Sequence, residues 1–208
     1  MIGIIDYGMG NLGSVTNACG YLGVPAQVLT KPEEFDTCEA LILPGVGAFG
    51  DCLRHLRDHG FVDPIRAWIE ADRPFLGICL GLQALFEGSD ESPGVAGLGL
   101  LPGWVRRFPA HLNLKIPQIG WNRVDQRQKG CPLFDGVPNA SFFYFVHSYY
   151  VDAGRADVVA GETEYGLRYA SAVCRGRLMA VQFHPEKSQA LGLLMLQNFA
   201  NQFTGAQP

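Results

Sequence analysis

Short apolar runs alternate with helical patterns through the first part of the chain, and this alternation most constrains the fold. The apolar runs cover residues 2–6, 26–30, 40–43 and 74–78. Helical patterns lie between and after them, at residues 11–22, 50–58, 63–71 and 80–86. Strands that alternate with helices form a parallel sheet with helices on both faces. We therefore predict an α/β fold with a mainly parallel central sheet, and we expect Asp63 to cap the third of these helices with Pro64 in its first turn.

The second half is richer in strands and aromatic residues. Strand patterns cover 141–151, 158–161, 168–174 and 178–183, and a last helix is predicted over 188–203. The short turn at Arg175-Gly176 predicts a hairpin, so we expect antiparallel strands to be added to the sheet in the C-terminal half. The length of 208 residues and the lack of a convincing linker predict one domain over 1–208.

The bulk properties exclude several classes of partner. A formal net charge of −4 argues against nucleic acid or an anionic membrane as the main partner. The chain has no apolar run of the ~20 residues that a membrane span needs, and its first residues lack the basic start of a signal peptide. The 6 cysteines include no CxxC pair, so neither a zinc site nor a disulfide framework is predicted. We expect a cytoplasmic protein with reduced thiols.

The most informative motif is Gly77-Ile78-Cys79-Leu80-Gly81, between a predicted strand and a predicted helix. It has the form of a nucleophile elbow with cysteine in the nucleophile position. Such a turn strains the backbone of its central residue, and glycine on either side removes side chains that would collide. The thiol of Cys79 then lies at a helix start, and the N–H of Leu80 is placed to donate to an oxyanion. A buried cysteine at a tight turn is the alternative interpretation, and it is the one that suits the other cysteines.

A nucleophilic cysteine needs a base, and His184 is the candidate among the 5 histidines. His184 and Glu186 flank Pro185 at the end of a predicted strand. An extended backbone would place both side chains on one side, and Pro185 makes a helix starting there less expected. The carboxylate would then hold one imidazole tautomer and stabilise the protonated form.

Two glycine-rich loops follow predicted strands. The backbone N–H groups of Gly45, Val46 and Gly47 are candidates for the second half of an oxyanion hole. The other loop, at 8–13, matches the GxGxxG pattern of dinucleotide-binding proteins, with Glu33 and Glu34 about 20 residues beyond it. Those acids lie past the predicted strand end, so we keep a dinucleotide site only as an alternative.

Taken together, these motifs resemble the class I (triad) glutamine amidotransferases over nearly the whole chain. More narrowly, they resemble the glutaminase subunits of imidazole glycerol phosphate synthases, in histidine biosynthesis. The matching stretches are DYGMGN (6–11), PGVG (44–47), GICLGLQ (77–83), GWN (120–122), FYFVHSYY (143–150) and VQFHPEKS (181–188).

The resemblance implies a hydrolase that releases ammonia from L-glutamine through a cysteine thioester and needs no cofactor. Cys79 would be the nucleophile, His184 the general base and acid, and Glu186 its orienter. Gln83 and the backbone around Ser148 and Tyr149 would hold the α-amino and carboxylate groups of glutamine. The loop Gly45, Val46, Gly47 would supply an oxyanion donor beside Leu80.

The resemblance also implies a heterodimer. The partner would be a (β/α)8-barrel cyclase that receives ammonia through a channel and makes imidazole glycerol phosphate and an aminoimidazole carboxamide ribotide. The positions that match the interface are Asn11, Trp121, Tyr144 and Lys187. Two residues depart from the family pattern: Gln118 stands where histidine is common, and Gly13 replaces a bulkier residue in the first helix.

Three alternatives stay open on the sequence. The first is a glutaminase that serves a different synthase, such as pyridoxal phosphate synthase. The second is a cysteine-elbow hydrolase or stress protein of similar architecture. The third is a non-catalytic binding subunit, including a dinucleotide binder that uses the 8–13 loop.

Overall fold

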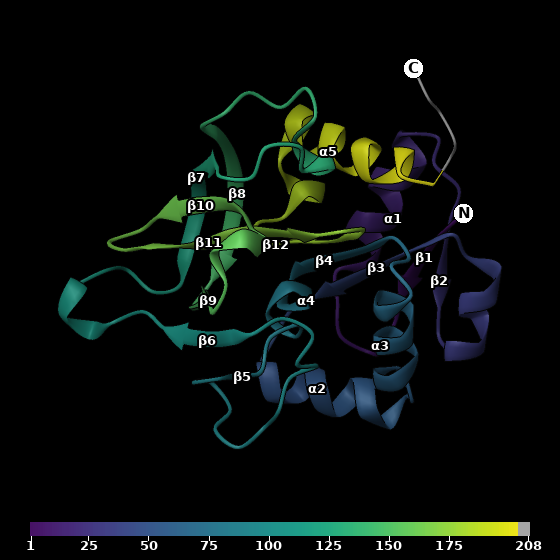
Figure 1. Cartoon of the computed structure of the whole chain (residues 1–208), viewed down its shortest axis with the longest axis horizontal. Coiled ribbons are helices and arrows are strands. Elements are labelled where there is room, and N and C mark those ends of the chain that lie inside the picture. Colours follow the sequence, from purple (N-terminus) through teal and green to yellow (C-terminus); the bar gives the residue numbers. More distant parts are fainter. Residues whose placement is uncertain (204–208) are drawn as a thin grey trace.

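One mixed β-sheet runs through the computed structural model, which describes residues 1–203 (Figure 1). Among these residues the main path of the sheet is β2-β1-β3-β4-β12-β11-β10-β7-β8, and β5, β6 and β9 branch from it through the β9–β11 pair. The strands are β1 (Ile2–Ile5), β2 (Ala26–Leu29), β3 (Ala40–Gly45), β4 (Phe75–Cys79), β5 (Gly88–Ser89), β6 (Gly103–Arg107), β7 (Gln118–Gln126), β8 (Ser141–His147), β9 (Tyr149–Ala153), β10 (Val159–Glu164), β11 (Arg168–Arg175) and β12 (Leu178–Val181).

The strands from β2 to β12 along this path are parallel, and those from β12 to β8 are antiparallel. Both predictions about the sheet are therefore confirmed, including the hairpin between β11 and β12. The strand β12 lies beside β4, with Val181 opposite Ile78. This pairing brings the segment that contains His184 next to the segment that contains Cys79, although they are far apart in sequence.

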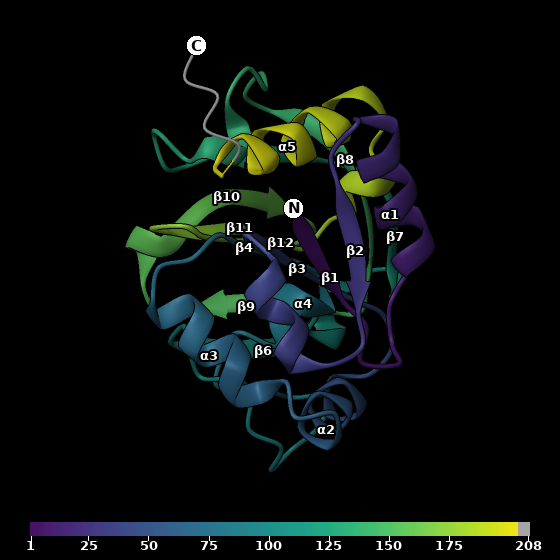
Figure 2. The ribbon, with the colours of Figure 1, turned by 90° about the vertical axis from the view of Figure 1, so that its right-hand side faces the viewer.

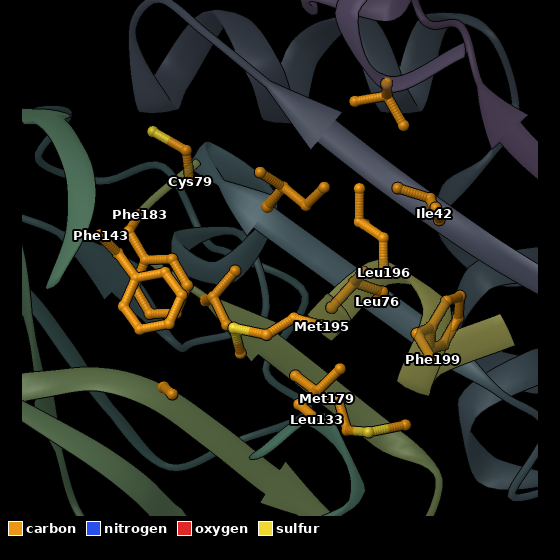
Figure 3. Close-up of a cluster of buried hydrophobic side chains, with 14 of the residues drawn as sticks. Ile42, Leu76, Cys79, Leu133, Phe143, Met179, Phe183, Met195, Leu196 and Phe199 are labelled. Carbon is orange, nitrogen blue, oxygen red and sulfur yellow. The ribbon is translucent and has the colours of Figure 1, made fainter. Parts of the chain in front are cut away.

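Helices cover both faces of the sheet (Figures 1 and 2). The helices are α1 (Leu12–Tyr21), α2 (Phe49–Asp58), α3 (Val62–Glu70), α4 (Leu80–Gln83) and α5 (Gln189–Asn201). One apolar cluster joins the sheet to α1 and α5, and a second joins it to α2 and α3. Figure 3 shows the first cluster, in which the rings of Phe143 and Phe183 stack with centroids 4.4 Å apart near Cys79. Burying these apolar side chains, at about 25 cal/mol per Å², is the main contribution that holds the layers together.

The structure corrects several local expectations. The helix α3 has Phe61, not Asp63, at its N-cap position, and Asp63 lies within its first turn. A 3-10 helix covers Pro185–Lys187, where an extended backbone was expected. Proline fits the first position of a helix because the N–H that it lacks has no partner there.

The predicted strand 141–151 is two strands, β8 and β9, separated at Ser148. The strands β6 and β7 had not been predicted as separate elements. Asn198 is buried in α5 and donates to the backbone carbonyls of Leu133 and Asp135, which explains an amide among core positions.

Within the described part of the chain, no helix is both long enough and apolar enough to cross a membrane. The prediction of a single domain over 1–208 stays a prediction.

Candidate active site

Cys79 ends β4 in the sharp turn that its neighbouring glycines predict. Its φ is 56°, in the left-handed region that side chains other than glycine rarely adopt. A Cβ on Gly81 would lie 2.0 Å from the backbone oxygen of Leu43, and a Cβ on Gly77 would lie 2.7 Å from the oxygen of Gly81. Only glycine fits these positions, because strand β3, strand β4 and helix α4 approach one another through bare backbone. The packing therefore holds the thiol at the end of the sheet.

His184 and Glu186 form a buried pair. The Nδ1 atom of His184 lies 2.8 Å from Oε1 of Glu186, and the two side chains are 4% and 1% exposed. The 3-10 helix after His184 brings the carboxylate back to the ring, so the predicted pairing is present with a different backbone. The other carboxylate oxygen, Oε2, is buried and has no hydrogen-bond partner among residues 1–203. The contact with His184 is therefore the main compensation for this buried charge.

The pKa of His184 reflects its two neighbours. Burial lowers it, but hydrogen bonding to Cys79 and to Glu186, together with their negative charges, outweighs burial and raises the pKa to about 10. The imidazolium form is therefore favoured when Cys79 is a thiolate. A cysteine and a histidine in this state can serve as nucleophile and proton donor.

A cavity of about 290 Å³ joins these groups. Its lining includes Cys79, His184, Gln83 and Lys187. The remaining lining residues are Val46, Gly47, Leu80, Glu91, Pro117, Val146, His147, Ser148 and Tyr149. Most of the residues predicted for catalysis, for the oxyanion and for substrate binding therefore meet at one cavity.

Two of the residues predicted for catalysis, the oxyanion or substrate binding do not line the cavity. Glu186 lies behind His184, as its predicted orienting role requires. Gly45 is the last residue of β3, and a Cβ there would lie 2.7 Å from the hydroxyl of Tyr7 and 2.8 Å from Cβ of Leu80. Gly45 thus allows close packing at the start of the loop, and Val46 and Gly47 face the cavity.

The sequence did not identify Gln182, whose amide contacts the thiol, or His147, whose imidazole lines the same cavity. Gln182 is fully buried, and its Nε2 lies 3.7 Å from Sγ of Cys79. Its Oε1 accepts from Nε2 of Gln83 at 3.0 Å. His147 is 6% exposed and contacts the carbonyl of Tyr149 through Nδ1 at 2.7 Å. The available signal was Gln182 within the apolar run 178–183, which was predicted as a strand. An amide at a buried position needs hydrogen-bond partners.

The residues predicted for a partner interface lie on neighbouring elements. Trp121 on β7 is 45% exposed, and its ring packs edge-on against Tyr144 on β8 with centroids 6.1 Å apart. Lys187 lines the cavity, and Asn11 caps α1 by accepting from the N–H of Ser14 at 3.4 Å. The 3-10 helix that carries Lys187 contacts both α1 and β8.

The Gln118 position belongs to a buried polar group. Its Oε1 lies 3.1 Å from Nε2 of His147 and accepts from the hydroxyl of Tyr169 at 3.0 Å. Glutamine can offer this site both a donor and an acceptor, as a histidine can. The departure from the family pattern therefore places an amide within hydrogen-bond distance of His147 and Tyr169.

In the dinucleotide alternative, Glu33 and Glu34 were the acidic candidates. Glu34 accepts from the N–H groups of Thr30 and Lys31, so its carboxylate is already engaged at the start of the 3-10 helix that follows β2. A larger cavity of about 630 Å³ lies apart from Cys79 and is lined by side chains of 126–139 and α5. The described residues contain no cluster of three or more side chains suited to hold a metal ion.

Comparison with known families identifies the family to which the chain belongs. The profile of the family "Glutamine amidotransferase class-I" matches residues 3–203. The chain therefore belongs to the class I glutamine amidotransferases, and the sequence-based assignment is confirmed.

Individual relatives narrow the comparison. The chain is 52% identical over 198 residues to imidazole glycerol phosphate synthase subunit HisH of Moorella thermoacetica, covering 95% of this chain and 93% of the relative. It is 49% identical over 199 residues to the subunit of the same name from Desulfitobacterium hafniense, covering 96% and 93%.

Solved structures share the fold at lower identity. A glutamine amidotransferase superposes with a TM-score of 0.74 at 22% identity, covering 99% of each chain. The structure of PurLQS from Thermotoga maritima gives a TM-score of 0.75 at 15% identity, covering 97% of each chain. These likenesses confirm the fold.

Proposed function

We propose that this chain is the glutaminase subunit of an imidazole glycerol phosphate synthase. The observation that carries the proposal is the convergence of Cys79, His184 and Gln83 on one cavity, with Glu186 behind the imidazole. The relatives that are about half identical over nearly the full chain support the particular synthase.

The proposed reaction is an acyl transfer. The Cys79 thiolate attacks the side-chain amide carbon of glutamine, and a tetrahedral intermediate forms. Leu80 and the Val46-Gly47 loop line the same cavity, and we assign their N–H groups to the developing oxyanion. The C–N bond then breaks, leaving a γ-glutamyl thioester on Cys79.

His184 moves the protons in this scheme. Cys79 and Glu186 raise the pKa of His184 to about 10 although burial lowers it, so the imidazole is protonated. This imidazolium gives a proton to the departing ammonia. The neutral imidazole then removes a proton from the water that attacks the thioester, and glutamate leaves. Glu186 stabilises the imidazolium and keeps Nδ1 protonated, so that the other ring nitrogen faces the reaction.

We assign recognition of the α-amino and carboxylate groups of glutamine to Gln83 and to the backbone of Ser148 and Tyr149. Both N–H groups of the Gln83 amide are engaged, by the Tyr149 carbonyl at 3.1 Å and by Gln182 at 3.0 Å. Its oxygen is then the atom left to accept from an ammonium group. Lys187 lines the same cavity and supplies a positive charge.

The proposed partner is a (β/α)8-barrel cyclase, bound as a heterodimer through the face that carries Asn11, Trp121, Tyr144 and Lys187. Aromatic side chains that are partly exposed are common anchors of protein interfaces. Ammonia would be protonated in bulk water, so a direct passage to the partner suits the chemistry. We place the complex in the cytoplasm, in keeping with 6 free cysteines.

The test is glutamate release from L-glutamine, measured with and without the cognate cyclase and its ribonucleotide ligand. We expect strong activity only in the liganded complex, and its loss on Cys79→Ala. The matched control is Cys19→Ala, a buried cysteine in α1 that is outside the cavity. Activity that survives Cys79→Ala would refute the nucleophile, and no response to the cyclase would refute the synthase.

A further inference from the structure

Gln182 lies between the nucleophile and the substrate-binding amide. It follows β12, whose register with β4 sets Val181 opposite Ile78, so the next residues along the two segments are Gln182 and Cys79. The side chain is 0% exposed and carries an amide between the apolar residues Val181 and Phe183 of the sequence. A buried amide without partners would cost free energy, so its contacts define where it is held.

The direction of each hydrogen bond around Gln182 is fixed by a backbone carbonyl. The oxygen of Tyr149 can only accept, and Gln83 Nε2 lies 3.1 Å from it, which orients the Gln83 amide with its NH₂ group toward Tyr149. The same NH₂ group lies 3.0 Å from Gln182, so the atom of Gln182 facing it must be the oxygen. The NH₂ group of Gln182 then faces Sγ of Cys79, 3.7 Å away.

His147 fixes the far end of the same chain. Its Nδ1 lies 2.7 Å from the Tyr149 carbonyl, so this nitrogen carries the proton. The Tyr149 carbonyl thus accepts from both His147 and Gln83. Four side chains and one backbone oxygen are thus connected: the Tyr149 carbonyl accepts from His147 and Gln83, Gln83 also donates to Gln182, and Gln182 donates to Cys79.

We propose that Gln182 is a positioning residue for the glutaminase reaction, joining the Gln83 amide that orients glutamine to the sulfur that attacks it. This inference rests on the roles proposed for Cys79 and Gln83. The Gln182 N–H is directed at the sulfur and stabilises the thiolate, because a hydrogen bond to a charged acceptor is stronger than one to a neutral acceptor. Its Oε1 holds the Gln83 amide with the oxygen toward the substrate.

The two contacts predict separate kinetic effects. Gln182→Met removes both contacts with little change in shape, and we expect kcat/KM to fall about 10- to 100-fold, from the usual effect of a hydrogen bond to a charged group. Gln182→Glu keeps an oxygen for Gln83 but replaces the donor to sulfur. We therefore expect Gln182→Glu to lower kcat while KM stays close to that of the wild type, whereas Gln182→Met changes both.

A double-mutant cycle with Gln83→Ala tests the connection. If Gln182 acts on KM through Gln83, Gln182→Met should not raise KM further in the Gln83→Ala background, although it should still lower kcat. A role that only supports the fold would lower the fraction of active protein, and hence the apparent kcat, by the same factor in either background and would leave KM unchanged. Thermal unfolding of each variant checks that it is folded under the conditions in which its kinetic constants are compared with those of the wild type.

The matched control is Asn198→Leu, which removes another buried amide, one that contacts the carbonyls of Leu133 and Asp135 away from the cavity. We expect it to lower the thermal midpoint and leave kcat and KM unchanged. All variants are measured in the complex with cyclase and ribonucleotide, beside Cys79→Ala. Kinetic constants of Gln182→Met and Gln182→Glu within about 2-fold of the wild type, with Cys79→Ala inactive, would overturn this inference alone. An active Cys79→Ala would instead overturn the proposed function.

Discussion

Acidification should destabilise this protein through one buried imidazole, His147. Burial lowers the pKa of His147 to about 4, with the positive charge of His184 acting in the same direction and the bond to the Tyr149 carbonyl opposing it. In the unfolded chain the same group has an ordinary pKa of 6.5. The fold therefore favours neutral His147, and the unfolded chain takes up the proton first.

The sign and the pH range follow from this difference. A folded pKa below the unfolded pKa gives stability that is complete above about pH 6.5 and is lost as the pH falls toward about 4. The whole difference corresponds to about 3 kcal/mol, at about 1.4 kcal/mol per pH unit. Between about pH 7.5 and about pH 5, linkage gives a loss of about 2 kcal/mol in the free energy of unfolding.

The assay is urea unfolding at a series of pH values, for the wild type and for His147→Gln. Glutamine offers a donor and an acceptor but does not titrate in this range. The stability advantage of the wild type over the variant should shrink by about 2 kcal/mol from about pH 7.5 to about pH 5. The raised pKa of His184 has the opposite slope, with stability lost as the pH rises toward about 10, and it cancels because both proteins carry it.

A difference between wild type and His147→Gln that stays constant within about 0.5 kcal/mol over this range would refute the reasoning. It would mean that His147 is protonated in the folded protein, or that its burial in the structure is not retained in solution.

Three further predictions concern the turn, the orienting carboxylate and the partner face. Gly81→Ala should lower the free energy of unfolding by about 3 kcal/mol or more, since its Cβ would lie 2.0 Å from a backbone oxygen, as urea unfolding would show. Glu186→Gln should lower kcat about 10²-fold and move the pH profile of glutamate release to lower pH, because the carboxylate supports protonated His184. Trp121→Ala should weaken binding of the cyclase by about 2 kcal/mol in titration calorimetry and leave thermal stability unchanged.

Two of these predictions have a matched control, and the third has a result that would contradict it. Gly13→Ala adds a methyl that meets nothing within 4 Å in α1, so it should stabilise the protein by about 0.5–1 kcal/mol where Gly81→Ala destabilises it. An unchanged pH profile in Glu186→Gln would contradict the orienting role. Ile119 is another exposed apolar residue of β7. Comparing Ile119→Ala with Trp121→Ala shows whether the loss in cyclase binding is specific to the Trp121 ring.

The sequence by itself determined the fold class and the sharp turn at Cys79. The alternation of apolar runs and helical patterns is a property of consecutive residues, and it predicted the parallel strands and most of the helices. The glycines at 77 and 81 identified Cys79, because a turn of this kind leaves no room for side chains beside the central residue. The pairing of His184 with Glu186 was also predicted, although the backbone between them is a 3-10 helix.

Only the tertiary structure decided which residues meet around the sulfur. The register of β12 on β4 brings Gln182 beside Cys79, and the break between β8 and β9 turns the Tyr149 carbonyl toward Gln83. Neither arrangement has a local signal, because strand order and register depend on how the apolar faces of distant segments pack. The low pKa of His147 likewise arises from burial by residues remote in sequence, which no local pattern specifies.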